Sequence, residues 1–109
     1  MLIKPEWMDA ALEYIATSGE DAAAAKGERI LAEHGVKQAK AKVFLTYQGS
    51  VAEREANAIA SPEYAAAVQR EARAVKEDEY HRTQRAKYEA VIEAWRTENA
   101  NRRAGNNFR

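Results

Sequence analysis

The sequence contains no cysteine, only two prolines and five glycines, and nine aromatic residues in 109. The absence of cysteine excludes disulfides, thiolate nucleophiles and cysteine-ligated zinc. No apolar run approaches the roughly 20 residues of a membrane span, and the first residues lack the apolar core of a signal peptide. These absences predict a chain without membrane contact in a reducing cytoplasm.

Charge is abundant but balanced, with 17 basic and 17 acidic residues. The net charge therefore gives no indication of a polyanionic partner. A chain of 109 residues corresponds to one domain, and a domain of this size buries only about two-thirds of its unfolded surface. Because much of the apolar content is alanine, we expect a thin core.

The pattern of helix formers and breakers predicts an all-α protein. Alanine, glutamate, lysine, arginine and glutamine fill most positions and favour helices. Breaks at Ser18-Gly19, Gln48-Gly49-Ser50 and Ser61-Pro62 follow the usual chemistry of helix ends. With Gly105 as a final stop, the single domain 1–109 is expected to contain helices over about 6–17, 20–47, 51–60 and 62–103, and a flexible tail over 104–109.

The fourth expected helix would extend roughly 60 Å, so it needs a partner along its length. The second expected helix can pair with it as a long antiparallel hairpin. A turn centred near Glu55 would place His34 beside Asp78. The second helix also carries an apolar stripe, which we expect to face its partner: Ala23/Ala24, Gly27, Ile30/Leu31, His34, Gln38, Ala41 and Phe44/Leu45.

Residues with catalytic or metal-binding chemistry are sparse. His34 and His81 are the only histidines, and neither lies in a helical metal-binding pattern. No phosphate-binding loop, nucleophile elbow or dinucleotide fingerprint occurs. We therefore expect no catalytic, cofactor-binding or metal-binding residue, no cofactor, and no enzyme activity.

The C-terminal part is basic: from Arg82 onward, seven basic residues face three acidic ones, a net charge of +4. Arginine and asparagine side chains can bind phosphates and bases. Alternatively, arginines near a helix end only complement the helix dipole, and the lysines of the second helix form a solvated face. The candidate nucleic-acid or partner-binding residues are Arg96, Asn99, Asn101, Arg102, Arg103, Arg109, Lys37 and Lys40.

Two stretches carry a resemblance to a known group of proteins. Ser50-Val51-Ala52-Glu53-Arg54-Glu55-Ala56 precedes Ala60-Ser61-Pro62-Glu63-Tyr64, and Trp95-Arg96 is followed by Asn99-Ala100-Asn101-Arg102-Arg103-Ala104-Gly105. From about Asp9 onward the chain resembles small uncharacterised helical proteins of tailed bacteriophages, encoded near early replication and recombination genes. The resemblance implies an accessory protein near DNA metabolism, and it transfers no site residue.

Three functions are compatible with these patterns. The first is a non-catalytic adaptor that binds single- or double-stranded DNA, or a DNA-processing complex, through the arginine-rich end. The second is a protein-only binder that inhibits a host defence or regulatory complex. The third is a structural, self-assembling helical protein. Under all three, a homo-oligomer is expected, because the long helix leaves apolar residues such as Trp95 or Tyr64 poorly covered.

Overall fold

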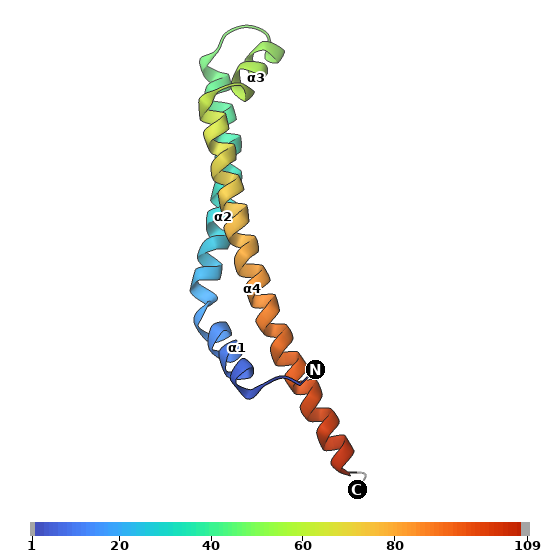
Figure 1. Cartoon of the computed structure of the whole chain (residues 1–109). Coiled ribbons are helices and arrows are strands. Elements are labelled where there is room, and N and C mark those ends of the chain that lie inside the picture. The colour runs from blue at the N-terminus through green and yellow to red at the C-terminus, as the bar shows by residue number, and fades with distance from the viewer. Residues whose placement is uncertain (1, 108–109) are drawn as a thin grey trace. The chain divides into compact units, whose positions relative to one another are not determined.

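The computed structural model describes residues 2–107, and side chains as far as residue 105. It consists of four helices, α1 (Pro5–Thr17), α2 (Gly19–Thr46), α3 (Val51–Ile59) and α4 (Pro62–Asn107), and no strand occurs in the described part (Figure 1). The predicted all-α class is confirmed. The starts of all four helices agree with the predicted starts to within one residue.

Two of the expected serines, Ser50 and Ser61, cap the helices that follow them. Ser50 caps α3, and its hydroxyl accepts a hydrogen bond from the Glu53 N–H at 3.1 Å. The Ser61 hydroxyl accepts from the Tyr64 N–H at 3.2 Å at the start of α4. Gly49 has φ of 124°, a conformation that disfavours residues with a side chain. These contacts fix where the chain leaves one helix and enters the next.

The end of α4 differs from the prediction. The helix passes through Gly105 and ends at Asn107, so the predicted end at residue 103 was wrong and residues 104–107 are not a non-helical tail. Gly105 lacks the positive φ that a helix-ending glycine adopts, and Gly49 is the one glycine with that geometry in the described chain. Phe108 and Arg109 lie outside the described residues.

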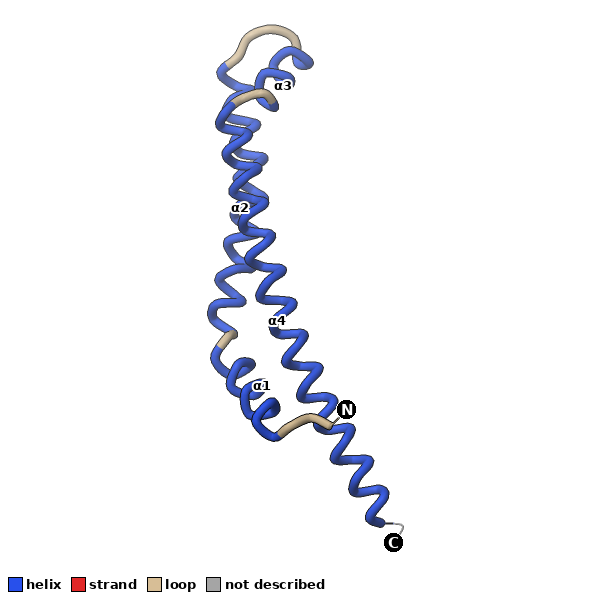
Figure 2. The backbone as a smooth tube through the Cα atoms, in the orientation of Figure 1, coloured by secondary structure: helices blue, strands red, loops and turns tan. Residues whose placement is uncertain are grey.

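The chain divides into two compact units, which we describe separately. Unit 2 (23–79) contains most of α2, all of α3 and the first part of α4. In it α2 and α4 run antiparallel as a helical hairpin, with α3 in the connection (Figure 2). Its buried apolar residues are small: Ala25, Ala32, Val43 and Ala58. The hairpin is therefore held by close approach of helices and not by large interlocking side chains.

The face of α2 that packs in unit 2 is opposite to the predicted one. Ala25, Ala32 and Val43 point inward, whereas Ile30, Leu31 and Leu45 of the expected stripe are exposed. The predicted neighbour of Asp78 on α2 was His34. In the structure Asp78 instead pairs at 3.1 Å with Arg29, which lies five residues before His34 in the sequence. The sequence reading assigned the larger apolar residues to the interface. The hairpin instead uses alanines, because small side chains let the two backbones come together.

Unit 1 (1–22 and 80–109) packs α1 against the second part of α4. The rings of Tyr14 and Tyr88 stack with centroids 4.4 Å apart. Ala11 is fully buried. Trp95, like Tyr64 in unit 2, is half-buried, so neither residue is left as uncovered as predicted. The stacked tyrosines place α1 against this part of α4.

Candidate nucleic-acid interface

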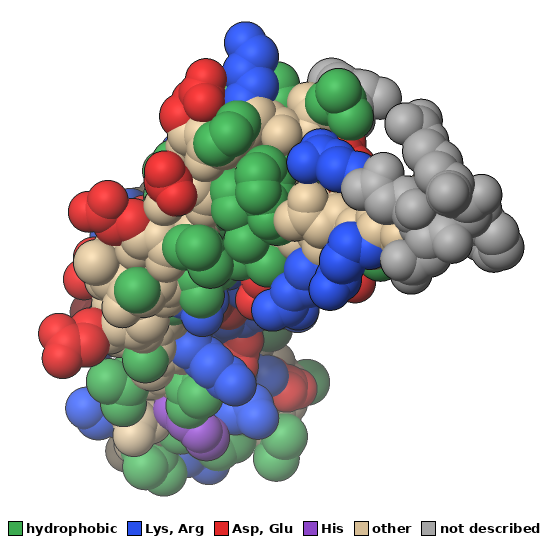
Figure 3. Space-filling model, turned by 90° about the horizontal axis from the view of Figure 1, so that it is seen from below, with side chains coloured by type: hydrophobic (Ala, Val, Ile, Leu, Met, Phe, Trp, Pro, Cys, Tyr) green, Lys and Arg blue, Asp and Glu red, His purple; other side chains and the backbone are tan. Residues whose placement is uncertain are grey.

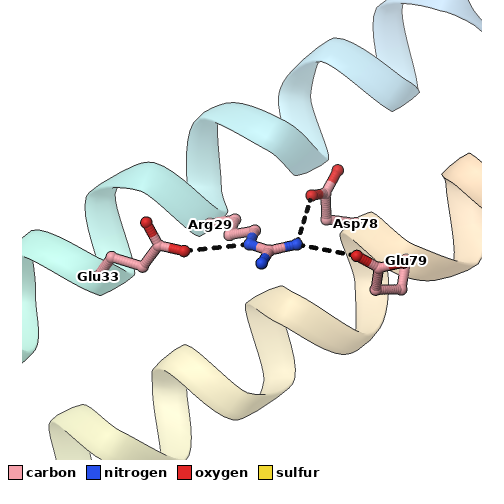
Figure 4. Close-up of polar contacts among 4 residues, drawn as sticks. All are labelled: Arg29, Glu33, Asp78 and Glu79. Atoms are coloured by element: carbon pink, nitrogen blue, oxygen red, sulfur yellow. Dashed lines mark hydrogen bonds and ion pairs between the residues drawn. The ribbon is translucent and has the colours of Figure 1, made fainter.

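The Arg29 guanidinium of unit 2 binds three carboxylates (Figure 4). Arg29 donates from Nε to Glu33 at 3.1 Å, and from one terminal nitrogen to Asp78 at 3.1 Å and Glu79 at 3.0 Å. Only 7% of the Asp78 side chain is exposed. The hydrogen bonds that Arg29 donates to Glu33, Asp78 and Glu79, named in order of decreasing effect, raise the pKa of Arg29 above its ordinary value. Arg29 therefore stays charged, and its role is to join α2 to α4.

Two surface grooves lie in unit 2, with volumes of about 260 and 350 Å³. They share Lys42, Val43 and Glu63, and the larger one also contains Arg70. Glu63 is the one carboxylate lining them, so no carboxylate pair is available for acid–base chemistry. Within residues 2–107, no group of three or more His, Asp or Glu side chains is arranged to hold a metal ion. The grooves therefore offer no arrangement that we can assign to a reaction.

The two candidate lysines on α2 have different surroundings. Lys40 forms an ion pair with Glu55 of α3 at 3.1 Å, which links α2 to the connecting helix. Lys37 is exposed. Only Lys37 is thus available for an outside partner without breaking a contact inside the chain.

Several of the cations in the C-terminal part serve the fold of unit 1. Arg85 donates to the Ser18 hydroxyl at 2.7 Å, which ties α4 to the junction between α1 and α2. The Lys87 ammonium lies over the Tyr88 ring, 5.1 Å from its centroid. Arg96 approaches Glu93 at 3.7 Å, but both side chains are about 70% exposed, so this pair is weak. The net charge of this segment therefore overstates the number of cations that are free to bind another molecule.

Arg102 and Arg103 remain as exposed cations on the last turns of α4. Neither forms a hydrogen bond or ion pair in the part of the chain that the structure describes. Because they are helical, their backbone is fixed and does not need to be ordered on binding. Two adjacent arginines, about 100° apart around the helix, present a broad cationic edge.

Helix geometry shows which of the remaining candidates lie on the same side of α4 as Arg103. Arg96, Asn99 and Arg103 follow one another at spacings of three and four, so they lie on one face. Asn101 lies about 160° around the helix from Asn99 and does not join that face. Asn99 is half-buried, and Asn101 is exposed. Arg109 lies outside the described residues. The candidate nucleic-acid interface is therefore defined as Arg96, Asn99, Arg102 and Arg103.

One residue beside this interface was missed by the sequence reading. Both carboxylate oxygens of Glu98 accept from the Ile3 N–H, at 2.8 and 3.1 Å. This contact holds the N-terminal segment against α4, one turn before Arg102. Ile3 and Glu98 are 95 residues apart in sequence, so no local pattern could indicate the pairing. The Glu98 carboxylate also lowers the positive potential near Arg102.

The view from below shows lysine and arginine side chains beside a group of hydrophobic side chains (Figure 3). In the described residues, no helix has the length and apolar character needed to cross a membrane. No protein-family model, curated protein or solved structure matches the chain. The function is therefore argued from the contacts and charges given above.

Proposed function

We propose that this protein is a non-catalytic helical adaptor that binds nucleic-acid phosphates through Arg96, Arg102 and Arg103. The setting that we propose from the phage resemblance is DNA replication or recombination in the host cytoplasm. The observation that carries the proposal is the state of Arg102 and Arg103, which are exposed, unpaired within the described chain and held on a helix.

The chemistry of this edge supports phosphate over base recognition. Guanidinium groups bind phosphate oxygens with paired N–H donors. Three arginines give at most about three phosphate contacts for each chain, so binding should be weak at physiological salt. Asn99 can add a hydrogen bond from the same face. Such an edge fits positioning on a nucleic-acid backbone and gives little means to read sequence.

The test is fluorescence anisotropy with labelled single- and double-stranded DNA at low and moderate salt. The wild-type chain should bind at low salt, and the double variant Arg102→Ala/Arg103→Ala should lose that binding. The matched control, Arg73→Ala/Lys76→Ala, also removes two exposed cations from α4 and should bind like wild type. Unchanged binding of the Arg102→Ala/Arg103→Ala variant, or no binding by wild type at low salt, would refute the proposal.

A second candidate is the protein-only binder of a host complex. It is favoured by the exposed apolar side chains of unit 1, namely Leu2, Trp7 and Leu12. These side chains bury apolar surface only if another molecule covers them. This candidate predicts a stable complex with a host protein and no affinity for DNA.

The third candidate, a self-assembling structural protein, predicts large oligomers that grow with concentration.

A further inference from the structure

Helix α2 has a second apolar face that nothing in its own unit covers. Large side chains on it are exposed to an unusual degree, with Ile30 at 46%, Leu31 at 58% and Leu45 at 75%. They follow small residues at spacings of three and four, which places them on one side of the helix. We name this face the outer stripe; its members are Ala23, Gly27, Ile30, Leu31, His34, Ala41 and Leu45.

The outer stripe contrasts with the outward face of α4 in the same unit. There the exposed positions include the polar Gln69, Arg73 and Lys76, and Val68, at 40%, is the one exposed large apolar side chain between residues 62 and 79. A polar, solvated face of that kind needs no partner, whereas exposure of an apolar face to water is unfavourable in free energy. No large side chain in the described chain is fully buried, so the hairpin gains little from its own core. The outer stripe is thus the exposed apolar surface that runs along α2; the other exposed large apolar residues of unit 2 are Tyr47, Val51 and Ile59 near the connection and Val68 of α4.

Gly27 would allow a second backbone to approach this face closely. A Cβ at Gly27 would meet no atom within 4 Å, so nothing inside the chain requires glycine there. Glycine in a helix interior costs up to about 1 kcal/mol relative to alanine. A helix from another molecule, lying close against the outer stripe, would give this glycine a role.

We propose that the outer stripe packs against the outer stripe of a second copy of this chain, with the two α2 helices antiparallel. The seam from Ala23 to Leu45 is about 33 Å long, or roughly three heptads, which is enough for a coiled-coil contact. With the two-fold axis near His34, Ala23 lies opposite Leu45 of the second copy. Gly27 then lies opposite Ala41. The small Ala23 thus meets the larger Leu45, and the two small residues Gly27 and Ala41 allow the backbones to come close.

Charge and size together favour the antiparallel over the parallel orientation. In the antiparallel pair, Lys37 of each copy lies within reach of Glu33 of the other, which binds Arg29 of its own chain through Oε1, and this gives two opposite-charge contacts. In a parallel pair, the facing flanks bring Lys37 toward Lys42 of the second copy, and like charges repel. A parallel pair also places Gly27 opposite Gly27 and Leu45 opposite Leu45, which leaves gaps at one end and crowding at the other.

Disulfide trapping tests the geometry directly, because the chain has no native cysteine. Position 34 lies at the proposed axis, so His34→Cys should form a disulfide with the cysteine at the same position of the second copy under mild oxidation. Ala23→Cys and Leu45→Cys should link to each other when the two variants are mixed, and each alone should link poorly. Arg73→Cys, on the polar face of α4, is the control and should stay reduced. Self-linking of Ala23→Cys and of Leu45→Cys without mixed linking would overturn the antiparallel arrangement.

Sedimentation equilibrium of the full chain tests whether the pair forms in solution. The wild type should be a dimer at micromolar concentration, and Ile30→Glu should weaken the dimer by at least tenfold. Gln69→Glu adds the same charge on the polar face of α4 and should leave the dimer unchanged. Circular dichroism of each variant checks that the helices form. A wild type that stays monomeric up to several hundred micromolar, or a dimer that Ile30→Glu does not affect, overturns the proposal.

Discussion

Arg29 of α2 and Asp78 of α4 form an ion pair of 3.1 Å across the hairpin, and the Asp78 carboxylate is almost entirely removed from water. Glu33 and Glu79 bind the same guanidinium from more exposed positions. A charge that is nearly buried is stable only while its partner neutralises it. The pair therefore fixes which residue of α2 lies beside which residue of α4.

Replacement of Asp78 by asparagine should lower the melting temperature more than replacement of Glu79 by glutamine. Both substitutions remove one negative charge beside Arg29, but Glu79 is about half exposed and its pair is screened by water. Thermal unfolding followed by circular dichroism measures the difference. Equal losses would mean that burial of Asp78 does not set the strength of this contact. Because the pKa of Arg29 is raised, the charged guanidinium contributes to the free energy of unfolding at physiological pH. That contribution is lost only well above physiological pH, as the pH rises through the raised pKa.

Gly49→Ala should destabilise the protein by about 1–2 kcal/mol, because a positive φ disfavours a side chain. The added Cβ would also lie 2.6 Å from the Glu53 carboxylate. Urea unfolding gives the free energy of unfolding. Ser50→Ala, which removes the cap of α3, should cost about 1 kcal/mol in the same measurement. A Gly49→Ala chain as stable as wild type would contradict the role of this glycine in the turn.

Gly27→Ala and Gly35→Ala should both raise the stability of α2 by up to about 1 kcal/mol, since each glycine is helical and has open space at its Cβ. Their effects on self-association should differ. Gly27 lies in the proposed seam, so its added methyl group should weaken the dimer, whereas Gly35→Ala should have little effect. Denaturant unfolding at several protein concentrations separates the two contributions. Identical behaviour of the two variants would argue against close approach at Gly27.

The salt dependence of DNA binding should count the arginines of the candidate interface. Each phosphate contact contributes about 0.9 to the slope of log K against log salt on duplex DNA. Arg96→Ala should therefore reduce the slope by about one. Asn99→Ala should weaken binding at constant salt, and Asn101→Ala, on the other side of the helix, should not. Equal effects of the two asparagine variants would show that the binding face is placed wrongly.

The candidate interface could be read from sequence only in part. The pattern of arginine and asparagine residues selects the segment, because charge and residue type are local properties. Which cations are free is not local: Arg85 is engaged by Ser18, 67 residues away, and Glu98 is engaged by Ile3. Only folding brings such residues together, so it removes some candidates and adds neighbours that no spacing reveals.

The sequence by itself determined the all-α class and the helix boundaries at Gly49, Ser50 and Ser61, because capping and propensity act within a few residues. Tertiary structure decided which face of α2 turns inward. Two apolar faces compete on that helix, one built on alanine and one on larger side chains. The ion pair of Arg29 with Asp78 and the close approach of alanine surfaces select the first. The larger residues are left outward, since the face that packs in the hairpin is set by the partner helix and not by α2 alone.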